Sequence, residues 1–172
     1  TFHAMTGEPG GEDGLDERFM QAGNENIGAT VMGRNMFGPV RGPWAGSDWK
    51  GWWGDEPPYH HPVFVLTHHP HEPIPMRGGT TFHFVTEGAR AALDRAFAAA
   101  GGKDVRLGGG AATIQEYLRA GLVDELHIAI VPLLLGDGER LFDGLEGGDT
   151  GLRCVELVSS DAVVHARLAR QV

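Results

Sequence analysis

The segment from Lys103 to Leu118 constrains the fold more than any other part of the sequence. A short apolar strand ends at Leu107, the glycines Gly108–Gly110 follow without a break, and an amphipathic helix begins at Ala111. Glycines at such a junction allow positive φ angles and let a ligand approach the backbone without meeting a Cβ atom. The first N–H groups of the helix lack intrahelical partners and favour an anion. The segment predicts a phosphate-binding turn, and a glycine turn that serves only packing is the alternative.

Length, charge and cysteine content limit the class of protein. The 172 residues suffice for one domain with its own core, so a single domain over residues 1–172 is expected. The net charge of −9 argues against nucleic acid or an anionic membrane as the main partner. Any phosphate site must therefore be local, made by backbone amides and one or two cations. The single cysteine, Cys154, is expected to be a small buried hydrophobic residue, and a lone cysteine suits the cytoplasm.

Strand and helix patterns alternate through the middle of the chain. This alternation predicts an α/β fold with a mixed, mostly parallel central sheet flanked by helices and a C-terminal antiparallel hairpin. Helices are expected at Leu15–Asn24, Ala89–Ala100 and Ala111–Ala120, and strands at Ala29–Met32, Val63–Leu66, Thr81–Val85, Val105–Leu107, Glu125–Val131, Leu133–Leu135, Leu152–Val158 and Ala162–Leu168.

Two stretches are predicted to lack regular structure. Residues 1–14 are rich in Gly, Glu and Thr and are expected to form an exposed loop. Residues 38–62 hold all four tryptophans and show neither a helical nor a strand period. Loops of this length are often lids or binding loops, and this one suggests a flat, aromatic substrate pocket. The alternative is a loop that its tryptophans pin in place to seal one end of the core.

Three predicted strands end in loops that suit ligand binding. The junctions are Met32–Arg34, Leu66–His68 and Leu107–Gly110. The carboxyl ends of parallel strands meet at one edge of a sheet, and ligands bind outside that edge. We therefore expect the three loops to converge on a single site.

These junctions, in this order and spacing, resemble the dihydrofolate reductase-like fold. The segment from Gly121 to Gly138, followed by Arg140-Leu-Phe142, is more similar to the reductase domain of the bifunctional riboflavin-biosynthesis deaminase/reductase (the RibD C-terminal domain) and its stand-alone relatives. The resemblance extends from roughly Gly28 to the C-terminus. The motifs that carry it are Val31-Met-Gly-Arg34, Val65-Leu-Thr-His68 and Leu107-Gly-Gly-Gly-Ala-Ala-Thr113.

The resemblance implies an NADPH-dependent reductase that transfers a hydride to a heterocyclic small molecule. Arg34 would supply a planar cation for a phosphate group, and the loop after Leu66 would cradle the adenosine ribose and its 2′-phosphate. The glycine turn and the helix start would hold the pyrophosphate and approach the nicotinamide. A cation at this edge favours NADPH over NADH. By resemblance, the cofactor-binding residues are Gly33, Arg34, Asn35, Met36, Leu66, Thr67, His68, Gly108, Gly109, Gly110, Ala111, Ala112 and Thr113.

No catalytic residue can be named, although Asp16 and Glu17 lie on the helix where the dihydrofolate reductase branch carries a carboxylate. The alternative is a solvated pair that merely favours the helix dipole.

A non-catalytic NADP(H)-binding protein of the same fold is the alternative function, and a bound flavin is a weaker one. Relatives commonly pair, and the apolar segment Leu133–Leu135 and the C-terminal hairpin suit an isologous homodimer.

The histidines predict no metal site. His68 to His71 lie on a strand end and a proline turn, from which neighbouring side chains diverge, whereas metal ligands need a rigid common frame. His127 lies on a predicted strand and faces either the pocket or solvent.

Members of the resembled family open with a strand that carries a Ser-x-Asp-Gly-like turn. Nothing in this chain matches that turn, and the sequence begins with Thr1-Phe2-His3. We therefore expect the native N-terminal strand to be missing and the central sheet to lack one member.

Overall fold

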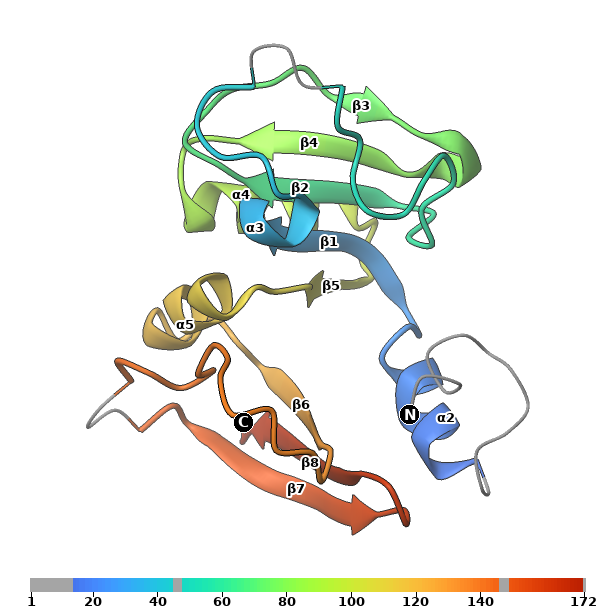
Figure 1. Cartoon of the computed structure of the whole chain (residues 1–172), viewed down its shortest axis with the longest axis vertical. Helices are drawn as coiled ribbons and strands as arrows, with labels where there is room; N and C mark the ends of the chain where they lie inside the picture. Colours follow the sequence, from blue (N-terminus) through green and yellow to red (C-terminus); the bar gives the residue numbers. More distant parts are fainter. Residues whose placement is uncertain (1–13, 45–47, 146–148, 172) are drawn as a thin grey trace. The chain divides into compact units, whose positions relative to one another are not determined.

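The computed structural model describes residues 14–44, 48–145 and 149–171 (Figure 1). The chain divides into two compact units: Asn26–Glu116, called here the central-sheet unit, and Thr1–Glu25 with Tyr117–Val172, called the hairpin unit. The predicted N-terminal loop, residues 1–14, lies outside the described residues except for Gly14. One domain over residues 1–172 stays a prediction.

The central-sheet unit is built on five strands in the order β3-β4-β2-β1-β5 (Figure 1). The parallel neighbours are β1 (Ile27–Gly33), β2 (Pro62–Leu66), β4 (Thr81–Val85) and β5 (Asp104–Leu107). Their positions confirm the predicted strands to within two residues. The short strand β3 (Ile74–Pro75) pairs with β4 in the antiparallel direction and was not predicted, because two residues carry no period.

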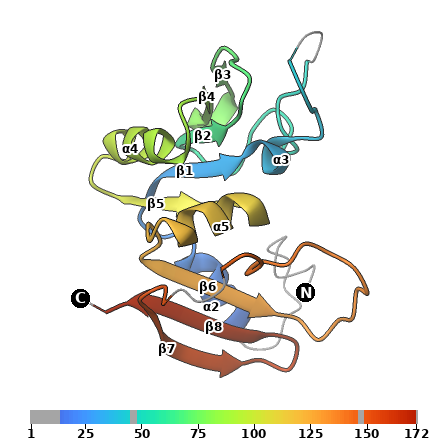
Figure 2. The same ribbon diagram turned by 90° about the vertical axis from the view of Figure 1, so that its left-hand side faces the viewer.

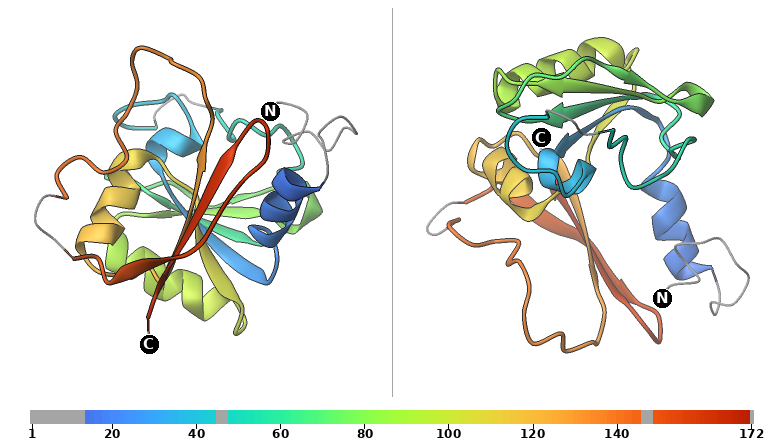
Figure 3. Two further views of the ribbon diagram at one scale, coloured as in Figure 1. Left: turned by 90° about the horizontal axis from the view of Figure 1, so that it is seen from below. Right: turned by 45° about the horizontal axis from the view of Figure 1, so that its top comes forward.

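Helix α4 (Ala89–Ala99) packs along β1 and β2 (Figure 3). Its small side chains at Ala92 and Ala96 are fully buried, so the helix can lie close to the sheet. Apolar residues spaced three and four apart predict such a buried stripe, and the structure confirms this helix. A single turn of 3-10 helix, η1 (Arg77–Gly79), precedes β4.

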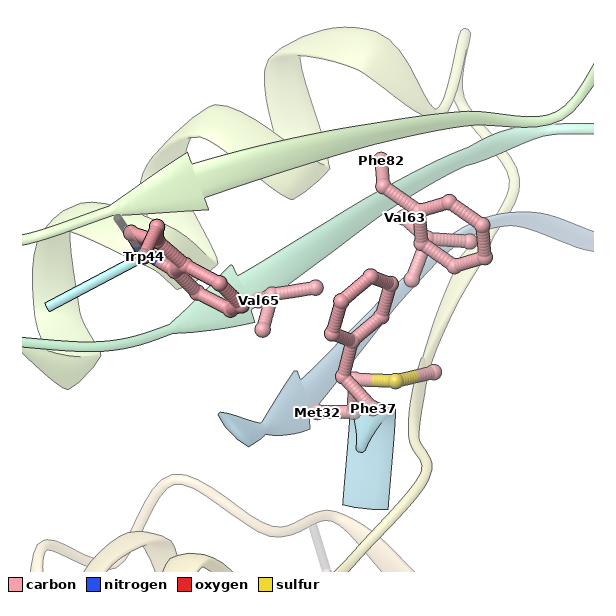
Figure 4. Close-up of a cluster of buried hydrophobic side chains, with 6 residues drawn as sticks. All are labelled: Met32, Phe37, Trp44, Val63, Val65 and Phe82. Carbon is pink, nitrogen blue, oxygen red and sulfur yellow. The ribbon is translucent and has the colours of Figure 1, made fainter. Parts of the chain in front are cut away.

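A group of buried side chains, called here the aromatic core cluster, joins β1, β2 and β4 to the segment that follows β1. It consists of Met32, Phe37, Trp44, Val63, Val65 and Phe82 (Figure 4). Phe37 is the last residue of the short helix α3 (Arg34–Phe37) and is fully buried. Its ring makes edge contacts with the rings of Trp44, Phe82 and Phe84, at centroid separations of 6.0, 5.0 and 5.3 Å. The cluster therefore fixes the segment that directly follows β1.

The tryptophan-rich stretch 38–62 is a packed loop in its described part. The indole Nε1 of Trp44 donates a hydrogen bond to the carbonyl oxygen of His69 (2.8 Å). Trp49 and Trp53 are partly buried against the aromatic core cluster, whereas Trp52 is 57% exposed. This packing favours the interpretation that the tryptophans pin the stretch in place and seal one end of the core. It gives less support to the interpretation that the stretch is a lid.

The hairpin unit holds a separate antiparallel sheet in the order β6-β8-β7 (Figure 2). Its strands are β6 (Glu125–Ile130), β7 (Leu152–Ser159) and β8 (Val164–Arg170). The predicted terminal hairpin is confirmed, and β6 pairs with β8. Helix α2 (Leu15–Ala22) belongs to this unit, and helix α5 (Ala111–Arg119) precedes β6. None of the described helices is long and apolar enough to span a membrane.

Two predictions for the hairpin unit are wrong. The segment Leu133–Leu135 forms no strand, and the Leu134 side chain is fully exposed, because no neighbouring strand pairs with it in the described part of the chain. Cys154 is exposed and not buried. A register shift between Cys154 and Glu156 interrupts the regular alternation of β7.

Tyr59 makes the stability of the central-sheet unit sensitive to alkaline pH. Burial raises the pKa of Tyr59 to about 12, and its ring packs edge-on against Trp53 (5.0 Å between centroids). An exposed tyrosine has a pKa of about 10. The folded state favours the neutral Tyr59 hydroxyl more than the unfolded state does. The contribution of this residue to the free energy of unfolding is therefore complete below pH 10 and is lost as the pH rises towards 12. We expect the free energy of unfolding, measured with guanidinium chloride, to fall over this range less steeply in Tyr59→Phe than in the wild type. Equal slopes would contradict this.

Candidate functional site

The candidate site lies at the carboxyl ends of β1 and β5. The chain runs from β1 to β2 to β4 on one side of β1, and β5 then pairs with β1 on its other side (Figure 1). A parallel sheet has a topological switch point where the strand order reverses, and ligands bind at the carboxyl ends there. The loops that leave these two strands, Gly33-Arg34 and Gly108–Gly110, are those that the sequence singled out.

Backbone hydrogen bonds hold the two glycine loops together. The Gly33 N–H donates to the carbonyl oxygen of Gly109 (2.7 Å), and the Gly108 N–H donates to that of Val31 (2.8 Å). A Cβ atom on Gly33 would lie 2.2 Å from Oγ1 of Thr113, so a side chain cannot enter without displacing that residue. Gly109 has a φ of +103°, a conformation that favours glycine. The side chain of Thr113 therefore covers Gly33, whereas a Cβ atom on Gly109 would meet no atom within 4 Å, so the backbone is open at Gly109.

Helix α5 begins directly after the glycines. The Ile114 N–H donates to the carbonyl oxygen of Gly110 (3.1 Å) and closes the first turn. The N–H groups of Ala111, Ala112 and Thr113 come before it and have no intrahelical partner. They carry the positive end of the helix dipole, so this turn can accept an anion.

Arg34 carries hydrogen-bond donors that no described residue satisfies. Its Nη1 donates to Oγ1 of Thr67 (3.3 Å), but its Nε and Nη2 are buried without a partner. The guanidinium carbon lies 3.7 Å from the centroid of the Trp44 ring, a cation–π contact. Burial, and to a lesser degree the charge of Arg41, lower the pKa of Arg34. Buried donors are normally paired, so an anionic oxygen suits this position.

The other predicted site residues lie at the same sheet edge. The Thr67 hydroxyl donates to the carbonyl oxygen of His69 (3.3 Å) and accepts from the His69 N–H (3.1 Å). Thr67 is buried, and its N–H donates to the carbonyl oxygen of Val85 (3.1 Å). Leu66 is the partly buried last residue of β2. The exposed residues are Asn35, Met36 and His68, whose side chains form no hydrogen bond or ion pair with the described chain. The structure therefore brings Arg34 and Thr67 together and leaves His68 apart.

Trp44 is a site residue that the sequence did not reveal. Its ring supports the Arg34 guanidinium from below while its Nε1 is bonded to the neighbouring loop. The only signal was the concentration of tryptophan in residues 38–62, which does not say which of the four contacts the arginine.

The neighbouring residues His60 and His61 contact more distant parts of the central-sheet unit. His61 Nε2 contacts Oγ1 of Thr30 (2.8 Å), and His60 Nδ1 contacts the carbonyl oxygen of Gly78 (2.7 Å). Across the described ranges, no three side chains of His, Cys, Asp and Glu are grouped so that they could hold a metal ion.

Comparison with known proteins places the chain in a family. The family model of the RibD C-terminal domain matches residues 3–166. The chain belongs to the RibD C-terminal domain family. The resemblance drawn from the strand-end motifs is thereby confirmed, and membership in this family supports a reductase-type function.

Solved structures of the same fold extend this result. A protein from Shewanella sp. PV-4, assigned provisionally to riboflavin biosynthesis, is 25% identical with a TM-score of 0.62, over 95% of this chain and 82% of that one. A diaminohydroxyphosphoribosylaminopyrimidine deaminase/5-amino-6-(5-phosphoribosylamino)uracil reductase from Thermotoga maritima is 12% identical with a TM-score of 0.57, over 93% and 50%. Dihydrofolate reductase from Enterococcus faecalis complexed with NADP(H) is 18% identical with a TM-score of 0.51, over 91% and 82%. The dihydrofolate reductase-like fold is confirmed.

A relative in Bacillus subtilis (strain 168), the uncharacterized protein YyaP, is 49% identical over 41 residues. This match covers 24% of the chain and 22% of YyaP. The chain therefore aligns with less than a quarter of that relative.

Proposed function

We propose that this protein is an NADPH-dependent reductase that transfers a hydride to a heterocyclic small molecule. The observation that carries the proposal is Arg34, which presents two buried, unpartnered donors beside the glycine loops at the sheet switch point. A pyrophosphate and a ribose phosphate are ligands that such donors, amides and a helix start can hold together. Family membership and the reductase neighbours support the same class of reaction.

The residues of the chain would divide the work of binding. Gly109 would let the pyrophosphate approach the backbone, because a Cβ atom there would meet no atom within 4 Å, and the first N–H groups of α5 would stabilise its charge. Arg34 and Thr67 would contact the phosphate at the adenosine end, which favours NADPH over NADH. Bound NADPH supplies the hydride, so the protein orients and shields the reacting groups.

Calorimetric titration with the two cofactors at equal concentration tests the binding site. We expect NADPH to bind more tightly than NADH, because only NADPH carries the 2′-phosphate. In Arg34→Met, the affinity for NADPH should fall about 10- to 100-fold, as expected for the loss of a charge-assisted hydrogen bond. Arg90→Met on α4, a surface arginine that pairs with Asp94, is the matched control and should bind as the wild type does. Equal affinity for both cofactors would remove the preference.

Oxidation of NADPH tests the reductase activity separately from binding. The full-length protein should oxidise NADPH in the presence of a pterin, a pyrimidine or a quinone. Tight binding without oxidation by any of these acceptors would favour a non-catalytic NADP(H)-binding protein. If the absorbance spectrum of the purified protein shows a bound flavin, the proposed cofactor is wrong and a flavin occupies the site in place of the nicotinamide nucleotide.

We also propose a homodimer in the cytoplasm. Leu134 and Leu135 are 103% and 83% exposed, and exposed apolar segments of this kind suit association between subunits. We expect Leu134→Glu to shift the molecular mass in analytical ultracentrifugation from dimer to monomer, because a carboxylate cannot be buried in an apolar interface. A wild-type protein that sediments as a monomer would remove the proposal.

A further inference from the structure

Three side chains of the hairpin unit form a continuous chain of hydrogen bonds. Nε2 of His165, on β8, lies 2.8 Å from Oδ1 of Asp16, on α2. Nδ1 of the same ring lies 2.9 Å from Nε2 of His127, on β6. His165 is only 4% exposed, whereas His127 is exposed. The chain therefore runs from a carboxylate through a buried ring to a ring at the surface.

Phe19 holds both imidazoles in place. Its ring stacks on His165 with 4.2 Å between centroids and an interplanar angle of 5°, and on His127 with 4.8 Å and 17°. Phe19 is itself buried, and Arg18 lies 4.6 Å over its ring. The stacking limits rotation of the two histidines, so the hydrogen-bonded geometry is set in advance.

The donors and acceptors of this chain fix the position of each proton. A carboxylate can only accept, so Nε2 of His165 carries a hydrogen. When each ring holds one proton, Nδ1 of His165 is an acceptor, and Nε2 of His127 must donate to it. Nδ1 of His127 is then left without a hydrogen, and it has no partner among the described residues. Nδ1 of His127, at the outer end of this hydrogen-bond chain, is therefore a free base.

The surrounding charges keep the two ends in these states. The hydrogen bond from His165 lowers the pKa of Asp16 against the opposing effect of burial, and a weaker contribution from Ser160 acts in the same direction as His165. Although His127 is exposed as a residue, its ring is partly desolvated where it stacks on Phe19. This desolvation lowers the pKa of His127, and the nearby His165 and Arg167 act in the same direction, while Glu156 opposes them. Glu156 is shared with Arg18 (2.8 Å) and Arg167 (3.5 Å), which weakens its effect. At neutral pH, Asp16 is therefore ionised and His127 is uncharged.

We infer that Asp16, His165 and His127 form a proton relay in which Nδ1 of His127 takes a proton from an O–H or N–H group of a small molecule. Proton uptake at Nδ1 makes the His127 ring cationic, and the hydrogen bond to His165 passes part of that charge towards Asp16. A carboxylate that orients an imidazole in this way stabilises the cation and selects the reactive tautomer. The base is a site of acid–base chemistry that is separate in its residues from the nucleotide-binding loops.

Nitrogen-15 NMR of the full chain tests the proton positions. We expect both His127 and His165 to carry their hydrogen on Nε2 at neutral pH. In Asp16→Asn, the amide can donate to Nε2 of His165, which moves the hydrogen of each ring to Nδ1. Glu17→Gln is the matched control, because Glu17 lies beside Asp16 on α2 and contacts only Gln21 in the described chain. A hydrogen on Nδ1 of His127 in the wild type would overturn the relay.

Cleavage of p-nitrophenyl acetate tests whether the base is reactive. The unprotonated Nδ1 attacks the carbonyl carbon, p-nitrophenolate leaves, and water hydrolyses the acetyl-imidazole to acetate and the regenerated ring. We expect His127→Gln and Asp16→Asn to lower the rate about 100-fold, the low end of what general acid–base groups contribute, and Glu17→Gln to leave it unchanged. An unchanged rate in folded His127→Gln would overturn the proposal. If His127→Gln does not fold, Asp16→Asn tests the proposal in its place, and an unchanged cleavage rate together with hydrogens that stay on Nε2 of both rings would overturn it. These outcomes are independent of NADPH binding.

Discussion

Replacement of Gly33 by alanine is expected to lower the affinity for NADPH at least tenfold and to destabilise the central-sheet unit by about 1–3 kcal/mol, the usual cost of forcing extra volume into a packed site. The new Cβ atom would lie 2.2 Å from Oγ1 of Thr113 and 3.6 Å from the carbonyl oxygen of Gly109. The φ angle of Gly33 is −77°, which any residue adopts, so the cost is purely steric. Calorimetric titration and guanidinium unfolding measure the two effects.

A double variant identifies the cause of this effect. In Gly33→Ala/Thr113→Ala, the Oγ1 atom is gone and the next contact of the new Cβ is Cβ of residue 113, at an ordinary 3.4 Å. We expect most of the lost stability to return, because the two residues are in direct contact and their effects are not additive. Thr113→Ala alone serves as the control. Wild-type affinity and stability in Gly33→Ala would show that the glycine loops are looser than the structure indicates.

Truncation of Phe37 to alanine is expected to cost about 3–5 kcal/mol of unfolding free energy, the range for removal of a buried phenylalanine ring. The ring is fully buried and makes edge contacts with Trp44, Phe82 and Phe84. The carbonyl oxygen of Phe37 also accepts the hydrogen bond from Nε1 of Trp49 (3.0 Å). Chemical unfolding followed by circular dichroism measures the loss.

Met36→Ala, on the same short helix, is the matched control for this variant. Met36 is 39% exposed, so its truncation should change the stability by no more than about 0.5 kcal/mol. If Phe37→Ala is too unstable to purify, Phe37→Leu keeps most of the volume and should show a smaller loss in the same direction. Wild-type stability in both Phe37 variants would contradict the packing of α3 described above.

The strand ends of the central sheet could be predicted because their signals are local. Apolar runs such as Val63–Leu66 define parallel strands, and the residues that follow them must meet at one edge. The glycines after Leu107 also predict a turn from local sequence alone, because glycine adopts positive φ angles that few other residues adopt. These rules placed Gly33, Arg34 and Thr67 at one edge of the sheet, where the structure has them. Whether they bind NADPH stays a prediction.

The remaining features depend on contacts between distant residues, which no local pattern encodes. The stacking of Arg34 on Trp44 joins a helix start to an irregular loop, and the sequence could not select Trp44 from four tryptophans. The pairing of β6 with β8 was not predicted either, because the strand pattern does not name its neighbour. The prediction of a strand at Leu133–Leu135 was wrong for a related reason. An apolar run becomes a strand only where a neighbouring strand pairs with its backbone.

If NADPH binds as proposed, the contact of Trp44 with Arg34 would give the protein an intrinsic fluorescence reporter of cofactor binding. Indole fluorescence responds to a nearby cation, and that cation would change its pairing as a phosphate arrives. The reduced nicotinamide ring, moreover, absorbs in the spectral region where indoles emit. Quenching of intrinsic emission should therefore follow occupancy in real time and without a label, and a Trp44→Phe protein would separate this signal from the light of the other three indoles.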